Sequence, residues 1–156
     1  MLNFYLYSVT SISLAVFYVA ALVLVNGLLQ LWLGGDVSPS TSKSIAAGLG
    51  FATVACPMWW VHWRWLRLQF SQAKGGAITW HRFYLFTIVC LNAMAMLIGG
   101  GIGITTLTGA LLGLSDSLAT GVAGAGVALF ALGLSIGLWL HHWHQFKGNL
   151  GQLLPQ

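Results

Sequence analysis

The sequence predicts an all-α integral membrane protein built as a four-helix bundle. Of its 156 residues, 58% are hydrophobic and only 5% are charged, whereas soluble domains carry roughly 25% charged residues. Six lysines and arginines and two aspartates are too few to cover a water-exposed surface. The apolar residues are also gathered into four long segments, and a helix of about 20 apolar residues spans the hydrocarbon layer of a membrane.

These segments are expected to form a single transmembrane domain over residues 1–156. The four spans are expected at about residues 5–33, 44–65, 82–112 and 117–142. The first is longer than a span requires, so a tilt or an overhang is expected. Proline removes a backbone donor and bends helices, so Pro57 is expected to bend the second span near its end.

The distribution of charge predicts the orientation of the spans. Four of the six basic residues occur in the connection between the second and third spans: Arg64, Arg67, Lys74 and Arg82. In the other two connections, Asp36 and Lys43 cancel and Asp116 stands alone. Connections rich in lysine and arginine face the cytoplasm, so both termini and the middle connection are expected on that side. Because the basic residues follow topology and form no stripe, no nucleic-acid partner is expected.

A weak internal repeat is visible at a constant offset of 79 residues, from Phe4 to Phe83. The same offset pairs Trp60 with Trp139 and His62 with His141. It predicts that residues 4–68 and 83–147 are two tandem helical hairpins. Each hairpin has two spans and therefore the same orientation, so a pseudo-two-fold axis would lie along the membrane normal.

Aromatic residues mark the ends of the second and fourth spans. Tryptophan rings favour the level of the lipid headgroups, so six tryptophans are expected to act as membrane anchors or interface residues. They are Trp59, Trp60, Trp63, Trp65, Trp139 and Trp143.

Few residues in the spans offer chemistry. No charged residue is expected inside the hydrocarbon, which argues against proton-coupled transport and intramembrane proteolysis. No catalytic residue and no metal site is predicted, and the protein is not expected to be an enzyme. His62 and His141 remain the candidate cofactor-binding residues, because an axial ligand to a tetrapyrrole needs only one neutral imidazole. The alternative is that both are amphipathic interfacial residues packed among tryptophans.

Small and mildly polar residues have structural interpretations. The glycines from Gly99 to Gly103 and along the fourth span favour close packing of the last two helices; the alternative is a flat pigment ring or sterol against bare backbone. Cys56 and Cys90 are expected to be free thiols that act as small buried packing residues. The midspan asparagines and threonines are expected to bond between helices or to the preceding turn.

The N-terminal Phe4-Tyr5-Leu6-Tyr7 and the exit Pro57-Met58-Trp59-Trp60-Val61-His62-Trp63-Arg64-Trp65 together carry a family resemblance. The chain resembles a bacterial family of small four-span membrane proteins described as a domain of unknown function. The resemblance implies four spans in a bacterial inner membrane. It supplies no activity and no catalytic residues.

We therefore expect a non-catalytic accessory subunit of a larger membrane complex, respiratory or photosynthetic, whose partners are membrane lipids and other transmembrane subunits. The alternatives are a small oligomeric transporter or channel, and a tetrapyrrole-binding electron carrier. A bound group, where one exists, would be a chlorophyll-type pigment, a carotenoid or haem.

Overall fold

A computed structural model describes residues 2–33, 38–71, 76–114 and 118–151, with side chains for 4–33, 38–69, 81–114 and 118–145. The described chain consists of four helices: α1 (Leu2–Trp32), α2 (Pro39–Ser71), α3 (Gly76–Leu111) and α4 (Leu118–Gly151). The all-α class is therefore confirmed. Each helix contains a stretch long and apolar enough to cross a membrane, as expected for a multi-pass membrane protein.

The helices α2, α3 and α4 extend further than the expected spans, chiefly at the end that holds the tryptophans. The second span was expected to begin near Ser44 and end near Trp65, yet α2 begins at Pro39 and runs through Pro57 to Ser71. Polarity limits the part of a helix that lies in lipid, whereas the backbone hydrogen bonds continue until a residue interrupts them. At about 1.5 Å per residue, a helix of 33 residues is roughly 50 Å long, well beyond the hydrocarbon thickness of about 30 Å.

Local signals at one end of the bundle define where α2 starts and α3 stops. Ser38 is the N-cap of α2, because its Oγ accepts a hydrogen bond from the Thr41 backbone N–H at 3.2 Å, and Pro39 follows at the first helical position. At the end of α3, Gly113 has a φ of 69°. The Gly113 N–H bonds to the Ala110 carbonyl and the Leu114 N–H bonds to the Gly109 carbonyl, which is the Schellman arrangement that stops a helix.

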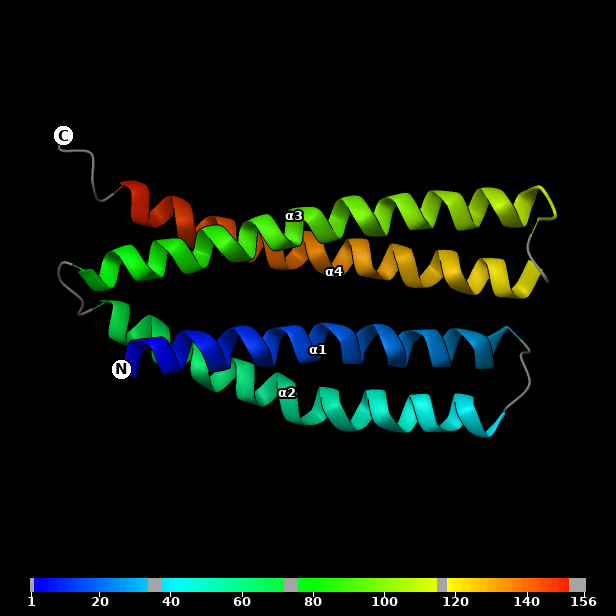
Figure 1. The fold of residues 1–156 in the computed structure, drawn as a ribbon, viewed down its shortest axis with the longest axis horizontal. Coiled ribbons are helices and arrows are strands. Elements are labelled where there is room, and N and C mark those ends of the chain that lie inside the picture. The colour runs from blue at the N-terminus through cyan, green and yellow to red at the C-terminus, as the bar shows by residue number, and fades with distance from the viewer. Residues whose placement is uncertain (1, 34–37, 72–75, 115–117, 152–156) are drawn as a thin grey trace.

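The four helices pack as two hairpins, α1 with α2 and α3 with α4. The hairpins meet mainly through α1 and α4, while α2 and α3 make little contact. The start of α1 and the end of α4 lie at the same end of the molecule as the end of α2 and the start of α3 (Figure 1). At the contact between hairpins, the Tyr18 hydroxyl and Ser135 Oγ are 2.8 Å apart, and Ser135 is fully buried. This polar contact joins α1 to α4.

Small residues bring the helices of each hairpin together away from the aromatic end. A Cβ built at Gly103 would lie 3.1 Å from the Ala128 Cβ, and one at Gly99 would lie 3.6 Å from the Ala131 Cβ. Glycines of α3 therefore pack closely against α4, as expected. By contrast, a Cβ at Gly100 or Gly101 would meet open space, so not every glycine of this segment serves that contact.

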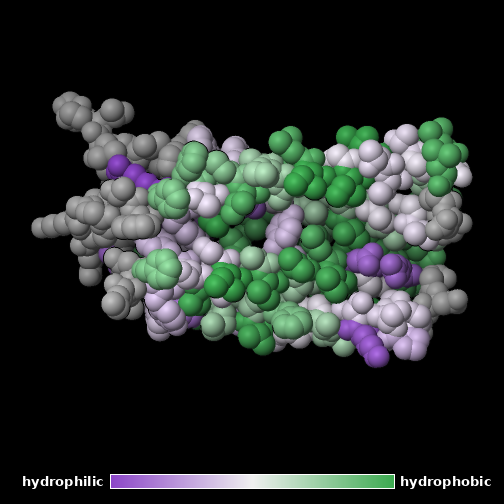
Figure 2. Space-filling model, viewed as in Figure 1, coloured by the Kyte–Doolittle hydropathy of each residue, from purple (hydrophilic) through white to green (hydrophobic). Residues whose placement is uncertain are grey.

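The larger core side chains gather toward the end where α1 and α3 begin. The buried cluster consists of Leu6, Leu14, Trp63, Leu66, Tyr84, Leu85, Ile88 and Leu138. Elsewhere the outer surface is strongly apolar, and hydrophobic side chains cover the middle of the face seen in Figure 2. The expectation that Cys56 and Cys90 are buried is wrong: both are free thiols on the exposed surface, since the faces of α2 and α3 that carry them turn away from the other helices.

Candidate functional site

The most concentrated chemistry in the described chain is a group of rings at the aromatic end of the bundle, here called the Trp63 cluster. All four helices contribute to it. Its members are Trp63 from α2, Tyr7 from α1, His81 and Tyr84 from α3, and His141 and His142 from α4. The N-terminal parts of α1 and α3 meet the C-terminal parts of α2 and α4 here, because each hairpin places its two open ends on this side.

Trp63 is the centre of the cluster and is only 2% exposed. Its ring centroid lies 5.1 Å from that of His142 and 5.8 Å from that of His141. On the other side it lies 6.1 Å from Tyr84 and stacks on His81 at 6.5 Å with an interplanar angle of 21°. These separations fall in the range of attractive aromatic pairs, so one indole links the two hairpins.

His142 is fully buried, and its ring orientation is fixed by its own helix. Its Nδ1 lies 2.8 Å from the Leu138 carbonyl oxygen. A carbonyl oxygen only accepts, so Nδ1 carries the proton and Nε2 keeps a lone pair. Within the described part of the chain, Nε2 of His142 and Nε2 of His141 have no hydrogen-bond partner. Both of these nitrogens are buried, and no side chain described here satisfies them.

The two histidines predicted as a matched pair have different surroundings. The His62 ring faces Tyr5 at 6.1 Å and Trp65 at 5.7 Å, within its own hairpin. His141 instead faces Trp63 in the other hairpin. Because these neighbours differ, the structure does not bring His62 and His141 to one ligand. His62 and His142 share one feature, a ring Nδ1 close to a carbonyl oxygen of the preceding turn. In His62 this oxygen is that of Met58, at 2.8 Å.

The predicted tryptophan anchors separate into three groups. Trp60 and Trp65 are exposed, at 58% and 53%. The remaining partly covered rings are those of Trp59, Trp139 and Trp143. Trp63 differs from the other five tryptophans, because it is only 2% exposed and packs between helices. The sequence did not reveal this difference, because tryptophans that are close in sequence at one helix end point in different directions around the helix.

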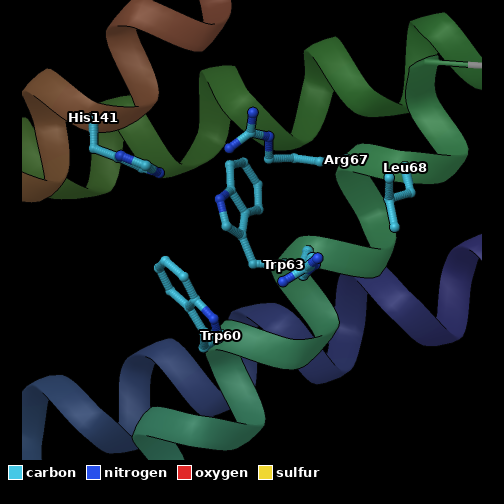
Figure 3. A pocket seen from close by; sticks show the side chains of 6 residues that line it. Trp60, Trp63, Arg67, Leu68 and His141 are labelled. Carbon is cyan, nitrogen blue, oxygen red and sulfur yellow. The ribbon is translucent and has the colours of Figure 1, made fainter.

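Beside the Trp63 cluster lies a cavity of about 420 Å³, here called the α2/α4 groove. It is lined by Trp60, Trp63, Arg64, Arg67, Leu68 and His141. In Figure 3, the side chains of Trp60, Trp63 and Arg67 extend from α2 toward α4, and His141 faces them from α4. Both arginines are exposed. The groove thus combines two guanidinium groups with two indole rings and an imidazole.

The polar residues in the middle of the helices bond locally. Asn92 donates to the Ile88 carbonyl at 2.8 Å, and Thr106 donates to the Ile102 carbonyl at 2.8 Å. Thr105 bonds to carbonyls of its own preceding turn in the same way. Among the residues described, no group of three His, Cys, Asp or Glu side chains is placed to hold a metal ion.

A family profile described as domain of unknown function (DUF5671) matches residues 3–134. The chain belongs to this family. The expected resemblance to a family described as a domain of unknown function is thus confirmed. The DUF5671 match includes Trp63 and both arginines of the groove, and it ends before His141 and His142. No curated protein and no solved structure matches the chain.

Sequence reasoning missed the groove and most of the cluster. Trp60, Trp63, Arg64 and Arg67 follow the spacing i, i+3, i+4, i+7, which places them on one side of a helix. This spacing could have predicted the groove, but the charges of Arg64 and Arg67 were interpreted only as a sign of membrane topology. The roles of Tyr7 and Tyr84 depend on how the two hairpins pack, and no local pattern gives that packing.

Proposed function

We propose that this DUF5671 chain is a non-catalytic accessory subunit of a larger complex in the bacterial inner membrane. In this proposal its outer faces pack against transmembrane helices of partner subunits, and lipids or pigments fill the remaining gaps. The supporting observation is the exposure of α2. Only 11% of its most apolar stretch is buried inside the bundle, against 39% for α4.

The exposed side of α2 carries a continuous series of large apolar residues, here called the α2 stripe. Its members are 42–65% exposed and consist of Phe51, Val54, Met58, Val61, Trp65 and Leu68. Their spacing alternates between three and four residues, as in helices that pack along one another. An outward stripe of this kind suits a neighbouring helix as well as lipid.

The position of the stripe favours a protein partner over lipid alone. A basic residue at the end of an apolar segment marks the headgroup level, and Arg64 is the first basic residue after the apolar segment of α2. Trp65 and Leu68 continue the stripe beyond this level, where acyl chains no longer cover apolar side chains. Apolar side chains of a partner subunit would cover them.

The proposal is tested by a photoreactive amino acid in place of Val61, with Ile104 on the exposed side of α3 as the matched control. Cells are irradiated, and the chain is extracted in mild detergent for native electrophoresis and mass spectrometry. We expect position 61 to cross-link to one defined membrane protein at a yield well above that of position 104. Lipid adducts alone at both positions, with the chain migrating by itself, would contradict the proposal.

We also propose that the two hairpins arose by tandem duplication and are related by a pseudo-two-fold axis along the membrane normal. The helix bounds support this. The offset of 79 residues carries Trp32, the last residue of α1, onto Leu111, the last residue of α3. It likewise carries Pro39 onto Leu118, the first residues of α2 and α4.

Both termini and the connection between α2 and α3 are proposed to face the cytoplasm, on the strength of the basic residues at that end. Gln69→Cys and Ser40→Cys, each exposed at opposite ends of α2, provide a matched test. The exposed Cys56 and Cys90 are first replaced by serine. A membrane-impermeant thiol reagent applied to intact cells should label position 40 and spare position 69; the reverse pattern would refute this orientation.

A tetrapyrrole-binding electron carrier is the second candidate, and the unsatisfied Nε2 of His141 supports it. Because His141 lines the α2/α4 groove and His62 does not, such a group would have one axial histidine from this pair. An absorption spectrum of the extracted chain tests this candidate. A Soret band that His141→Ala abolishes and His62→Ala preserves would support it.

A further inference from the structure

The α2/α4 groove contains positive charge, and its lining, as far as the structure describes the chain, includes no acidic side chain. Arg64 and Arg67 both line it and are exposed. The chain has only two acidic residues, Asp36 and Asp116. In sequence they fall between α1 and α2 and between α3 and α4, whose adjoining helix ends lie at the opposite end of the bundle (Figure 1). The two guanidinium groups can therefore bind an anion from outside the chain.

The two arginines lie on the same side of α2 and line the same groove. They are three residues apart on α2 and so lie on one side of the helix, in adjacent turns. Each guanidinium is planar and presents its N–H donors as a fork that matches the oxygen atoms of a phosphate. Two such forks on one side of a helix recognise a phosphate group better than a single point charge does.

The depth of the groove matches that of a lipid headgroup. The apolar part of α2 begins at Ser44, and Arg64 lies 20 residues further along the helix. The distance between the two along the helix axis is about 30 Å. This distance equals the usual thickness of the hydrocarbon layer. Arg64 and Arg67 thus stand at the level of the phosphates of one leaflet when α2 crosses a membrane.

The remaining walls suit the glycerol and the first part of the acyl chains. Trp60 is 58% exposed, and its ring turns into the groove beside that of Trp63 (Figure 3). Indole rings combine an apolar face with one polar edge, which suits the boundary between headgroup and acyl chain. His141 closes the side formed by α4. The cavity of about 420 Å³ is large enough for a headgroup with its glycerol.

We propose that the α2/α4 groove is a specific site for an anionic membrane phospholipid, whose phosphate lies between Arg64 and Arg67 and whose glycerol lies against Trp60 and Trp63. Basic pockets between transmembrane helices on the cytoplasmic side bind lipid headgroups in this way. Leu68 is the one lining residue of the groove that also belongs to the α2 stripe, so the site does not require that the stripe contacts another subunit.

The experiment is native mass spectrometry of the full-length chain, delipidated in detergent and titrated with phosphatidylglycerol, phosphatidylcholine or inorganic phosphate. We expect one phosphatidylglycerol to bind at least about 10-fold more tightly than phosphatidylcholine, with no competition from millimolar inorganic phosphate. Each arginine removed should weaken binding about 10-fold, as a charged hydrogen bond predicts. The double variant R64Q/R67Q should therefore lose the bound lipid.

The matched control is Lys43→Gln, which removes a positive charge from the exposed surface at the opposite end of the same helix and should leave binding unchanged. The double variant R64K/R67K keeps both charges but loses the forks, so its affinity should fall between those of the original chain and R64Q/R67Q. Circular dichroism verifies that the variants fold. Equal binding of both lipids, an equal loss with Lys43→Gln, or displacement of phosphatidylglycerol by inorganic phosphate would overturn the proposal.

Discussion

The role of Trp63 as the link between the hairpins predicts a large and specific effect of Trp63→Ala on stability. A buried tryptophan side chain buries about 150–250 Å² of its surface. At about 25 cal/mol per Å², this burial corresponds to roughly 4–6 kcal/mol of stabilisation. Measured replacements of buried aromatic residues by alanine destabilise by about 3–5 kcal/mol. Unfolding in a membrane leaves side chains in partly apolar surroundings, so we expect a loss of about 3 kcal/mol.

The assay is unfolding of the purified chain in mixed micelles with increasing denaturing detergent, followed by circular dichroism. Trp65→Ala is the matched control, because Trp65 lies two residues away on the same helix and is 53% exposed. Its effect should stay below about 1 kcal/mol. Trp63→Phe, which keeps a ring in the site, should lose less than Trp63→Ala. Equal effects of Trp63→Ala and Trp65→Ala would refute the reasoning, since they would show that Trp63 is no more buried than its neighbour.

Three further predictions concern contacts between helices. Tyr18→Phe removes the bond to Ser135 and should lower the free energy of unfolding by about 0.6 kcal/mol, the average for hydrogen bonds between membrane helices, as measured by the same unfolding assay. Gly103→Leu should destabilise the protein by about 1–3 kcal/mol through overpacking against α4. The matched variant Gly101→Leu should not, because its new side chain points into open space. Equal melting temperatures of these two variants would contradict the contact between Gly103 and α4. Ala125→Leu, in the buried part of α4, should destabilise by about 1–3 kcal/mol, while Ala46→Leu at the equivalent exposed position of α2 should change stability by less than about 0.5 kcal/mol.

The helices themselves could be predicted from the sequence, because composition and segment length are sufficient for that inference. The ends of the helices were harder to predict. Trp65 seemed to close the second span, yet α2 continues to Ser71, since the residues beyond Trp65 are polar enough to leave the lipid but do not interrupt helical hydrogen bonding. By contrast, Pro39 and Gly113 are explicit start and stop signals, and the helix boundaries lie beside them.

The site was only partly accessible to the same reasoning. The sequence identified the tryptophan-rich exit of α2 and the histidines of α4 as unusual, and the structure places both around Trp63. It could not show which ring is buried, because Trp60 and Trp63 share one side of α2 and differ in how far α3 and α4 cover them. That coverage is a property of the packing between hairpins, which leaves no periodic signal in either hairpin alone.

The way the hairpins meet explains why two halves with matching helix bounds differ in their side chains. Contact runs through α1 and α4, so α4 lies between two helices while α2, its counterpart at the offset of 79 residues, remains at the edge. Small residues such as Ala125 and Ala128 let α4 fit between its neighbours, whereas α2 keeps Phe51 and Met58 on an open surface. The offset of 79 residues places His142 at the position equivalent to Trp63. Because the hairpins meet in this asymmetric way, these two rings pack against each other. They therefore join equivalent points of the two hairpins at the centre of the cluster.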